Sequence, residues 1–209
     1  KTPRQSRIEY DLREALVLTT DELWIGYRKG WFPMAGPGGD VDWYTAPVRA
    51  LFPITGVKVS RSLARRLRNG GFQVTFDQEF EAVVRGCFRP QGNWLTEDFV
   101  VAYTRAHQEG WGHSCEVWKD GVLAGGIYGL AVGQSFSAES MFHRVTDASK
   151  VALWTMVEQC RSLGFKAFDA QIMNPHLASM GAYEVTEREF LGLLKELRDQ
   201  PTPWSQRRA

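Results

Sequence analysis

The spacing of hydrophobic positions changes along this chain and predicts which elements it forms. Stretches with apolar residues three and four apart are typical of helices that bury one face. Such stretches span residues 20–30, 60–71, 78–88, 96–110, 145–164 and 186–198. Most of them begin near a Ser, Thr or acidic residue and end near a glycine, as helices commonly do. We therefore expect helices at these places.

A different pattern predicts strands between residues 112 and 143. Two runs rich in β-branched and aromatic residues flank Asp120-Gly121, which is a strong signal of a β-hairpin. A third strand is expected after Gly133. Shorter strands are expected at residues 73–77 and 166–173, and an extended piece at 42–54 is broken by prolines.

The order of these elements predicts the fold class. Helices, then an antiparallel meander, then a helix–strand–helix unit indicate an α+β protein with a mixed α/β sheet. A turn-rich loop at residues 35–40 sets the first part of the chain apart, and we place a soft boundary near Val57. The prediction is a small N-terminal α+β domain at residues 1–57 and a larger domain at residues 58–209.

Composition narrows the class of function. Of 209 residues, 44% are hydrophobic and 23% are charged, and the net charge is +1. These values fit a globular protein, in which any contact with nucleic acid must use a local basic patch. No apolar run approaches the roughly 20 residues that a membrane span needs, and the first twelve residues have no apolar signal-peptide core. We expect no contact with a membrane.

Cysteine and histidine are too few and too scattered for a metal site. The three cysteines are an odd number without a CxxC spacing, and the four histidines form no HxxxH or HExxH pattern. This argues against a disulfide framework or a zinc site and suits a reducing cytoplasm.

One short stretch, "SRSLARRLR", concentrates positive charge. Arg61, Arg65 and Arg68 recur at helical spacing and share one face, and Arg66 adds a fourth guanidinium. Arginine matches phosphate oxygens with two parallel N–H groups, so this helix could follow a nucleic-acid backbone. A run of this kind is more often an ordinary solvated face, and the sequence leaves both interpretations open.

Acidic and amide side chains interrupt two otherwise apolar strands. Glu139 lies in "SFSAESMF", and Asp169 and Gln171 lie in "FDAQIM". Residues two apart on a strand share a face, so Asp169 and Gln171 should point the same way. Because burying an unpaired carboxylate is costly, each acid needs a partner or a function. Glu139 could receive a cationic substrate or pair with an internal arginine such as Arg144.

An amide beside a carboxylate suits the chemistry of amine transfer. Gln171 cannot act as a strong base, but it can orient an attacking amine, and Asp169 could fix its direction. The alternative is a structural hydrogen bond between strands. In a loop, Trp94 of "GNWLTED" offers an aromatic surface that could stack on a base or cover the edge of the core.

Several stretches together resemble one known family. They are "YRKGWFPM", "WYTAPVRALFP", "VSRSLARR", "NWLTEDFVVAY", "HSCEVW", "GGIYGLAVG", "FSAESMF", "DASKVAL" and "FDAQIMNPHLASMGA". In this order they resemble the leucyl/phenylalanyl-tRNA–protein transferases, bacterial enzymes that add Leu or Phe to protein N-termini. The resemblance covers residues 27 to 185 and implies a small N-terminal domain before a larger acetyltransferase-like (GNAT-like) domain.

The resemblance also implies an activity and its residues. An aminoacyl group passes from Leu-, Phe- or, less well, Met-tRNA to a protein that begins with Arg or Lys, which marks it for degradation, and no metal or organic cofactor is needed. Asp169 and Gln171 correspond to the catalytic pair, Glu139 to an acid of the active-site pocket, and Trp94 to a residue that helps bind the acceptor end of the tRNA.

The remaining correspondences concern substrate contacts. The side chains expected to line the apolar pocket for Leu or Phe are Ile127, Phe136 and Leu153. Paired aromatic residues of the substrate site correspond to Trp43 and Tyr44. The tRNA-backbone surface corresponds to Arg61, Arg65, Arg66 and Arg68.

Other functions stay possible from the residues alone. A CoA-dependent acetyltransferase would want a glycine-rich turn opening a helix, and the turn before residues 145–153 is not glycine-rich. A tRNA-dependent transferase that acts on another amine, such as a cell-wall peptide, and a non-catalytic tRNA-binding module remain alternatives.

Overall fold

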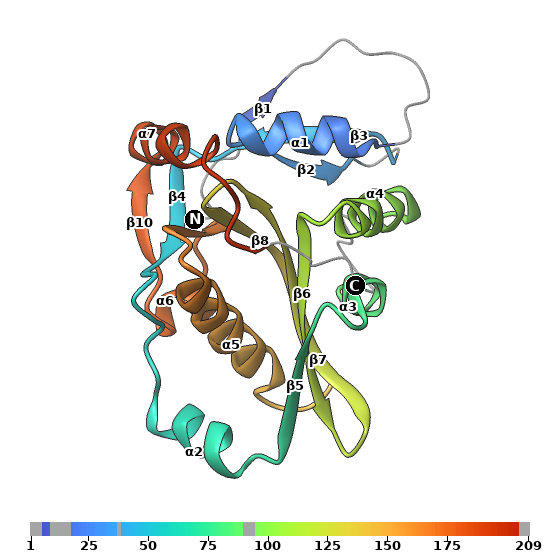
Figure 1. The fold of residues 1–209 in the computed structure, drawn as a ribbon, viewed down its shortest axis with the longest axis vertical. Helices are drawn as coiled ribbons and strands as arrows, with labels where there is room; N and C mark the ends of the chain where they lie inside the picture. Colours follow the sequence, from blue (N-terminus) through green and yellow to red (C-terminus); the bar gives the residue numbers. More distant parts are fainter. Residues whose placement is uncertain (1–5, 9–17, 37–38, 90–94, 205–209) are drawn as a thin grey trace.

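The computed structural model of the chain describes residues 6–8, 18–36, 39–89 and 95–204 (Figure 1). A seven-stranded sheet forms its centre, in the order β10-β4-β9-β8-β7-β6-β5. These strands are β10 (Tyr183–Thr186), β4 (Val48–Phe52), β9 (Ala167–Gln171), β8 (Ser135–His143), β7 (Val122–Val132), β6 (Gly112–Lys119) and β5 (Phe72–Phe76). Strands β8 and β9 are parallel, and the other neighbours are antiparallel. The predicted mixed α/β class is confirmed.

A small second sheet lies at one end of the molecule. It consists of β1 (Ser6–Ile8), β3 (Val41–Thr45) and β2 (Phe32–Ala35), and α1 (Thr20–Arg28) lies beside it (Figure 1). Strand β4 follows directly and already belongs to the large sheet, although it precedes the boundary predicted at residue 57. The division of the chain into domains at that residue stays a prediction.

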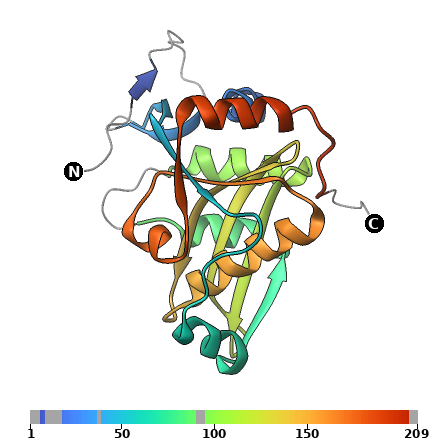
Figure 2. The same cartoon turned by 90° about the vertical axis from the view of Figure 1, so that its left-hand side faces the viewer.

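Helices cover both faces of the large sheet. One face packs against α5 (Ala148–Leu163), with α2 (Arg61–Asn69) and α6 (Pro175–Ser179) beside it, and the other packs against α3 (Phe80–Gly86) and α4 (Glu97–Gln108). The last helix, α7 (Glu187–Leu197), lies at the same end as α1 (Figures 1 and 2). Each face has its own hydrophobic cluster, so the sheet separates two cores.

Local sequence signals explain most of these limits. Thr19 and Thr186 form capping boxes with the glutamates three residues later, and Ser60 caps α2. The cap of α1 is therefore Thr19, directly before the helix predicted at residues 20–30. Gly164 ends α5 with a φ of 100°, a left-handed conformation that glycine adopts without a steric penalty.

The predicted hairpin is confirmed. Strands β6 and β7 pair in antiparallel fashion across Asp120 and Gly121, whose φ angles are 52° and 77°. Two successive residues with positive φ are what a tight type I′ turn requires.

A β-bulge in β8 is the feature of the sheet that most affects the site. Gly129 pairs with Ala138 but Tyr128 pairs with Ser140, so Glu139 is an extra residue on β8. A side chain at position 129 would place its Cβ 2.3 Å from the carbonyl oxygen of Ser137. The close approach of the two strands next to the bulge therefore requires glycine.

We expect Gly129→Ala to lower the free energy of unfolding by about 1–3 kcal/mol, because the added methyl group must push β7 and β8 apart. A urea titration should show a lower midpoint with an unchanged slope. The control is Gly192→Ala in α7, where a Cβ would meet nothing within 4 Å. This substitution should stabilise the helix by up to about 1 kcal/mol. Equal midpoints for Gly129→Ala and the parent chain would contradict this account of the bulge.

Candidate active site

A buried ion pair joins the neighbouring strands β4 and β9 of the large sheet. The Nε and Nη2 atoms of Arg49 donate to the two carboxylate oxygens of Asp169 over 2.9 and 2.6 Å. Their side chains are 2% and 0% exposed. The Ser137 hydroxyl donates to Asp169 over 3.2 Å, and the backbone N–H of Gln171 donates over 2.8 Å.

These four donors use the acceptor capacity of the Asp169 carboxylate, since a carboxylate offers about four lone-pair sites. Aromatic rings close the other side of the pair. The guanidinium of Arg49 lies 4.9 Å from the ring centre of Phe32 and 4.5 Å from that of Phe190. Asp169 is thus a fully paired, internal group.

Gln171 is held in a different way from the one expected. It ends β9 with a φ of 61°, which is unusual for a residue with a side chain. Its backbone N–H meets Asp169, and its side-chain amide donates to Oε1 of Glu139 over 2.8 Å. Strand alternation alone therefore gave the wrong partner for this amide: it meets Glu139, while Asp169 accepts from the main chain.

Glu139 has neutral partners in the described part of the chain. The hydroxyl of Tyr103 donates to Oε2 over 3.2 Å, and the hydroxyl of Tyr27 lies 3.2 Å from that of Tyr103. Burial raises the pKa of Glu139 to about 7, although hydrogen bonds from Tyr27 and Gln171 oppose the shift. The pairing with Arg144 is not found, because that guanidinium donates to the carbonyl of Leu123.

The two tyrosines reach Glu139 from two helices. Tyr27 is on α1 and Tyr103 is on α4, and both are almost fully buried. Burial, the largest cause, and the nearby charge of Glu139 raise the pKa of each phenol well above its usual value. Both therefore stay protonated near neutral pH and serve as hydrogen-bond donors.

Strand pairing explains why the site lies here. The parallel pairing of β8 and β9 covers only three residue pairs and ends at Ser137 and Asp169. Glu139 and Gln171 come two residues later on each strand, where their side chains take over the connection. Beyond Ser137 and Asp169, β8 and β9 are therefore no longer joined by backbone pairing.

The residues predicted to line the amino-acid pocket lie together. Ile127, Phe136 and Leu153 are at most 2% exposed and belong to the cluster on the α5 face of the sheet. Glu139 instead contacts Tyr103, which belongs to the cluster on the α3–α4 face. The predicted pocket and the acid are therefore on opposite faces. The assignment of the pocket stays a prediction.

The two aromatic residues predicted as a pair, Trp43 and Tyr44, point to opposite sides of β3. Trp43 packs on Gly26 of α1, where a Cβ would come within 2.0 Å of its ring. Its neighbour Tyr44 stacks on Phe32, with 6.3 Å between ring centres, and so lies on the opposite side of β3, toward Arg49. Trp94 lies outside the described residues. Substrate contacts by all three stay predictions.

The basic helix is only partly available. On α2, Arg61, Arg65 and Arg68 are exposed. Arg66 is on another face and forms an ion pair with Asp147 at the start of α5, over 3.3 Å. The structure therefore separates the predicted group into three exposed cations and one that connects α2 with α5.

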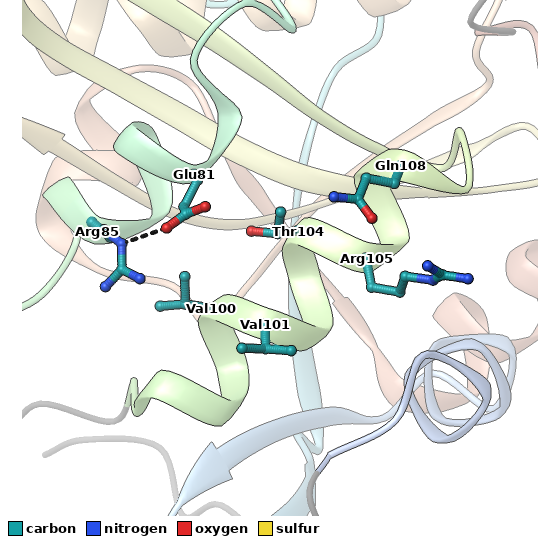
Figure 3. A pocket seen from close by; sticks show the side chains of 7 residues that line it. All are labelled: Glu81, Arg85, Val100, Val101, Thr104, Arg105 and Gln108. Atoms are coloured by element: carbon teal, nitrogen blue, oxygen red, sulfur yellow. Dashed lines mark hydrogen bonds and ion pairs between the residues drawn. The ribbon is translucent and has the colours of Figure 1, made fainter.

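A surface pocket between α3 and α4 is distinct from all of these groups (Figure 3). It is lined by Glu81, Arg85, Val100, Val101, Thr104, Arg105 and Gln108. Its two arginines already form exposed ion pairs with glutamates. None of the predicted site residues in the described part of the chain lines it.

Two further features are absent from the described residues. No group of three or more His, Cys, Asp or Glu side chains there is arranged to hold a metal ion. No helix in the same part of the chain has the length and apolar character to cross a membrane.

Comparison with known proteins decides the family. The sequence model of the leucyl/phenylalanyl-tRNA protein transferases matches residues 51–195, and the model of their N-terminal domain matches residues 17–47. The chain belongs to the leucyl/phenylalanyl-tRNA–protein transferase family. The resemblance found in the sequence motifs is thereby confirmed, and the chain is an aminoacyltransferase.

Individual members of the family agree over most of their length. The transferase of Rubrobacter xylanophilus is 46% identical over 180 residues, which are 86% of this chain and 94% of the relative. That of Thiobacillus denitrificans is 41% identical over 195 residues, 90% of this chain and 86% of the relative. Among solved structures, a GCN5-related N-acetyltransferase-like protein from Streptococcus suis gives a TM-score of 0.34 at 15% identity, covering 66% of this chain and 61% of that one.

Sequence analysis of this transferase missed three residues of the site. Arg49 had a visible signal, since it is a charged residue in the apolar strand "VRALF". Tyr27 and Tyr103 had none, because a tyrosine in an amphipathic helix is an ordinary core residue. Their role depends on the bulge that carries Glu139.

We expect Arg49→Leu to lower the free energy of unfolding by about 3–5 kcal/mol, because it leaves a buried carboxylate without its charge partner. The combined change Arg49→Leu with Asp169→Leu should recover much of this loss. The control is Arg161→Leu, which removes an exposed pair with Glu158 and should cost no more than about 1 kcal/mol. Denaturant titrations of the four proteins provide the measurement. Similar losses for Arg49→Leu and Arg161→Leu would show that the buried pair is not special.

Proposed function

We propose that this chain transfers Leu or Phe, and less well Met, from aminoacyl-tRNA to proteins that begin with Arg or Lys. The products are thereby marked for degradation in the cytoplasm. Membership of the family supports the transfer reaction. The observation that carries the proposal is the carboxylate–amide pair of Glu139 and Gln171 at the point where β8 and β9 cease to pair.

This pair suits an amine as the acceptor. The Gln171 amide donates its N–H to Glu139, so its carbonyl oxygen is directed elsewhere and can accept a hydrogen bond from an incoming amine. Glu139 has no ion pair among the described residues, and its carboxylate can therefore receive the charge of an α-ammonium group. An N-terminal Arg or Lys adds a second positive charge that the same acid attracts.

The donor needs little chemical activation. The aminoacyl ester is already reactive, and correct alignment of two reactants can supply about 7–11 kcal/mol of the barrier. Asp169 contributes by fixing the main chain at Gln171, and Arg49 fixes Asp169. The pair expected from the sequence keeps these roles in the proposal: Asp169 is a supporting acid, and Gln171 is an orienting amide.

The donor's side chain would occupy the apolar region of Ile127, Phe136 and Leu153. Leu, Phe and Met carry no branch at Cβ, whereas Ile and Val would place an extra carbon near the α-carbon. An apolar pocket discriminates by only about 10–200-fold per methylene group, so this steric difference would matter most. Because the β8–β9 pairing ends next to Phe136, an aminoacyl group could reach from there to Glu139 on the other face. The acceptor end of the tRNA would contact Trp94, Trp43 and Tyr44.

The proposal is tested by incubating the protein with radiolabelled Leu-tRNA and two peptides that differ only in an N-terminal Arg or Ala. Labelled product from the Arg peptide alone is expected, and Phe-tRNA should also serve as donor. Equal labelling of both peptides, or labelling of a cell-wall peptide amine instead, would contradict the proposed acceptor.

The exposed arginines of α2 are expected to bind the tRNA backbone. Replacing Arg65 and Arg68 by Ala should weaken tRNA binding and reduce the slope of log K against log salt by about 0.7–0.9 for each phosphate that an arginine no longer neutralises. The matched control is Arg66→Ala on the same helix, whose guanidinium is already paired with Asp147. A titration of tRNA binding at several salt concentrations gives both slopes. The same slope in the double variant and the parent chain would mean that these arginines are ordinary surface charges.

A further inference from the structure

The two acids of the site have opposite surroundings. Asp169 is held by a guanidinium and by hydrogen bonds from Ser137 and the main chain, which leaves it no capacity for a substrate. Glu139 is in contact with neutral donors from three elements: Tyr27 of α1, Tyr103 of α4 and the amide of Gln171 on β9. Its side chain is also partly exposed, whereas that of Asp169 is fully buried.

We propose that Glu139 is the catalytic proton acceptor of the transfer reaction and that Tyr27 and Tyr103 are positioning residues that hold its carboxylate. Asp169 then acts only through the backbone. This inference rests on the proposed function, because it requires an amine acceptor and an aminoacyl ester.

The step balances without a further reactant. The neutral α-amine attacks the ester carbonyl, and a C–N bond forms while the carbonyl oxygen gains the charge. The nitrogen, now carrying an extra proton, passes it to the Glu139 carboxylate. As the carbonyl re-forms, the C–O bond to the ribose breaks, and Glu139 returns the proton to the leaving ribose oxygen. The products are an amide and a hydroxyl, and the carboxylate is restored.

Glu139 fits this role better than its neighbours do. A neutral amide such as that of Gln171 is not a useful base, and Asp169 has no open lone pair. A general base works best when its pKa is close to the working pH. Burial raises the pKa of Glu139 to about 7, whereas an ordinary glutamate with a pKa near 4.3 would bind a proton too weakly.

The buried phenols and the buried thiol near Glu139 stay protonated near neutral pH. Burial raises the pKa of Tyr27, Tyr103 and Tyr128 well above the usual value for a phenol, and that of Cys87 on α3 to about 12. The carboxylate of Asp169 also acts on Glu139 through its charge, and it is paired with Arg49. A change of activity near pH 7 would therefore report Glu139 or the acceptor amine.

The test is the pH profile of kcat/KM for the Arg peptide at saturating Leu-tRNA, between about pH 5.5 and 9. In the parent chain kcat/KM should rise through about pH 7 as Glu139 loses its proton. Glu139→Gln keeps the shape and the contact with Gln171 but removes the base, so kcat/KM should fall by about 10²–10⁴-fold. In Glu139→Gln, the rise of kcat/KM that comes from deprotonation of Glu139 should be absent.

The variants Tyr103→Phe and Tyr128→Phe test whether Tyr103 positions the Glu139 carboxylate or only supports the fold. Tyr103→Phe removes a hydroxyl that favours the charged carboxylate, so the pKa of Glu139 should rise and the profile should move to higher pH. Tyr128→Phe removes a hydroxyl from the same cluster that has no hydrogen-bond partner among the described residues, and it should leave the profile in place. The amine, with a pKa of about 7.7–8.0, contributes equally in every variant.

The outcomes distinguish this inference from the proposed function. If the parent chain labels no Arg peptide, the proposed acceptor is wrong. If it does, and Glu139→Gln retains kcat/KM within about tenfold with the same profile, Glu139 is not the proton acceptor. Should Glu139→Gln fail to fold, Tyr103→Phe decides alone: a profile that coincides with that of Tyr128→Phe overturns the inference.

Discussion

The rest of the structure depends on the buried pair of Arg49 and Asp169. Taking two charges out of water costs several kcal/mol per ion, and only close geometry and further hydrogen bonds offset that cost. Here the pair joins strands that are 120 residues apart in sequence. The ring of Phe32 from the small sheet and that of Phe190 from α7 cover the guanidinium. The small sheet, the large sheet and the last helix must therefore all be in place before the pair is stable.

The buried ion pair gives Asp169 and Glu139 different surroundings. Because Asp169 is neutralised and immobile, the turn at Gln171 that follows it is fixed, and the amide there has one orientation. Glu139 stands on a bulge, where a residue is free of strand pairing and can be directed into a site. Its partners are neutral, so its charge remains available to a substrate. In the proposed mechanism, Asp169 thus provides geometry and Glu139 provides chemistry.

The sequence predicted the features that depend on neighbouring residues. Helix caps such as Thr186 and the turn at Asp120-Gly121 are local signals, and both gave correct elements. The pairing of β4 with β9 and β10 was not predicted, since it depends on contacts between distant segments. For the same reason the acids Glu139 and Asp169 were recognised as unusual, but the ion pair of Asp169 with Arg49 and the contact of Glu139 with Gln171 were not predicted. The bulge that frees Glu139 from the alternation of β8 has no sequence signal of its own.

Helix α1 and the small sheet contribute side chains directly to the site. Tyr27 and Phe32 lie in one short stretch, "YRKGWFPM", and each reaches one of the two acids: Tyr27 contacts Glu139, and Phe32 covers the arginine that holds Asp169. Without this stretch, both groups would be more exposed to water. The pKa of Glu139 would then move back toward that of an ordinary carboxylate, because burial is the largest cause of its shift. The stretch "YRKGWFPM" therefore helps to set the pKa of Glu139 as well as the shape of the site.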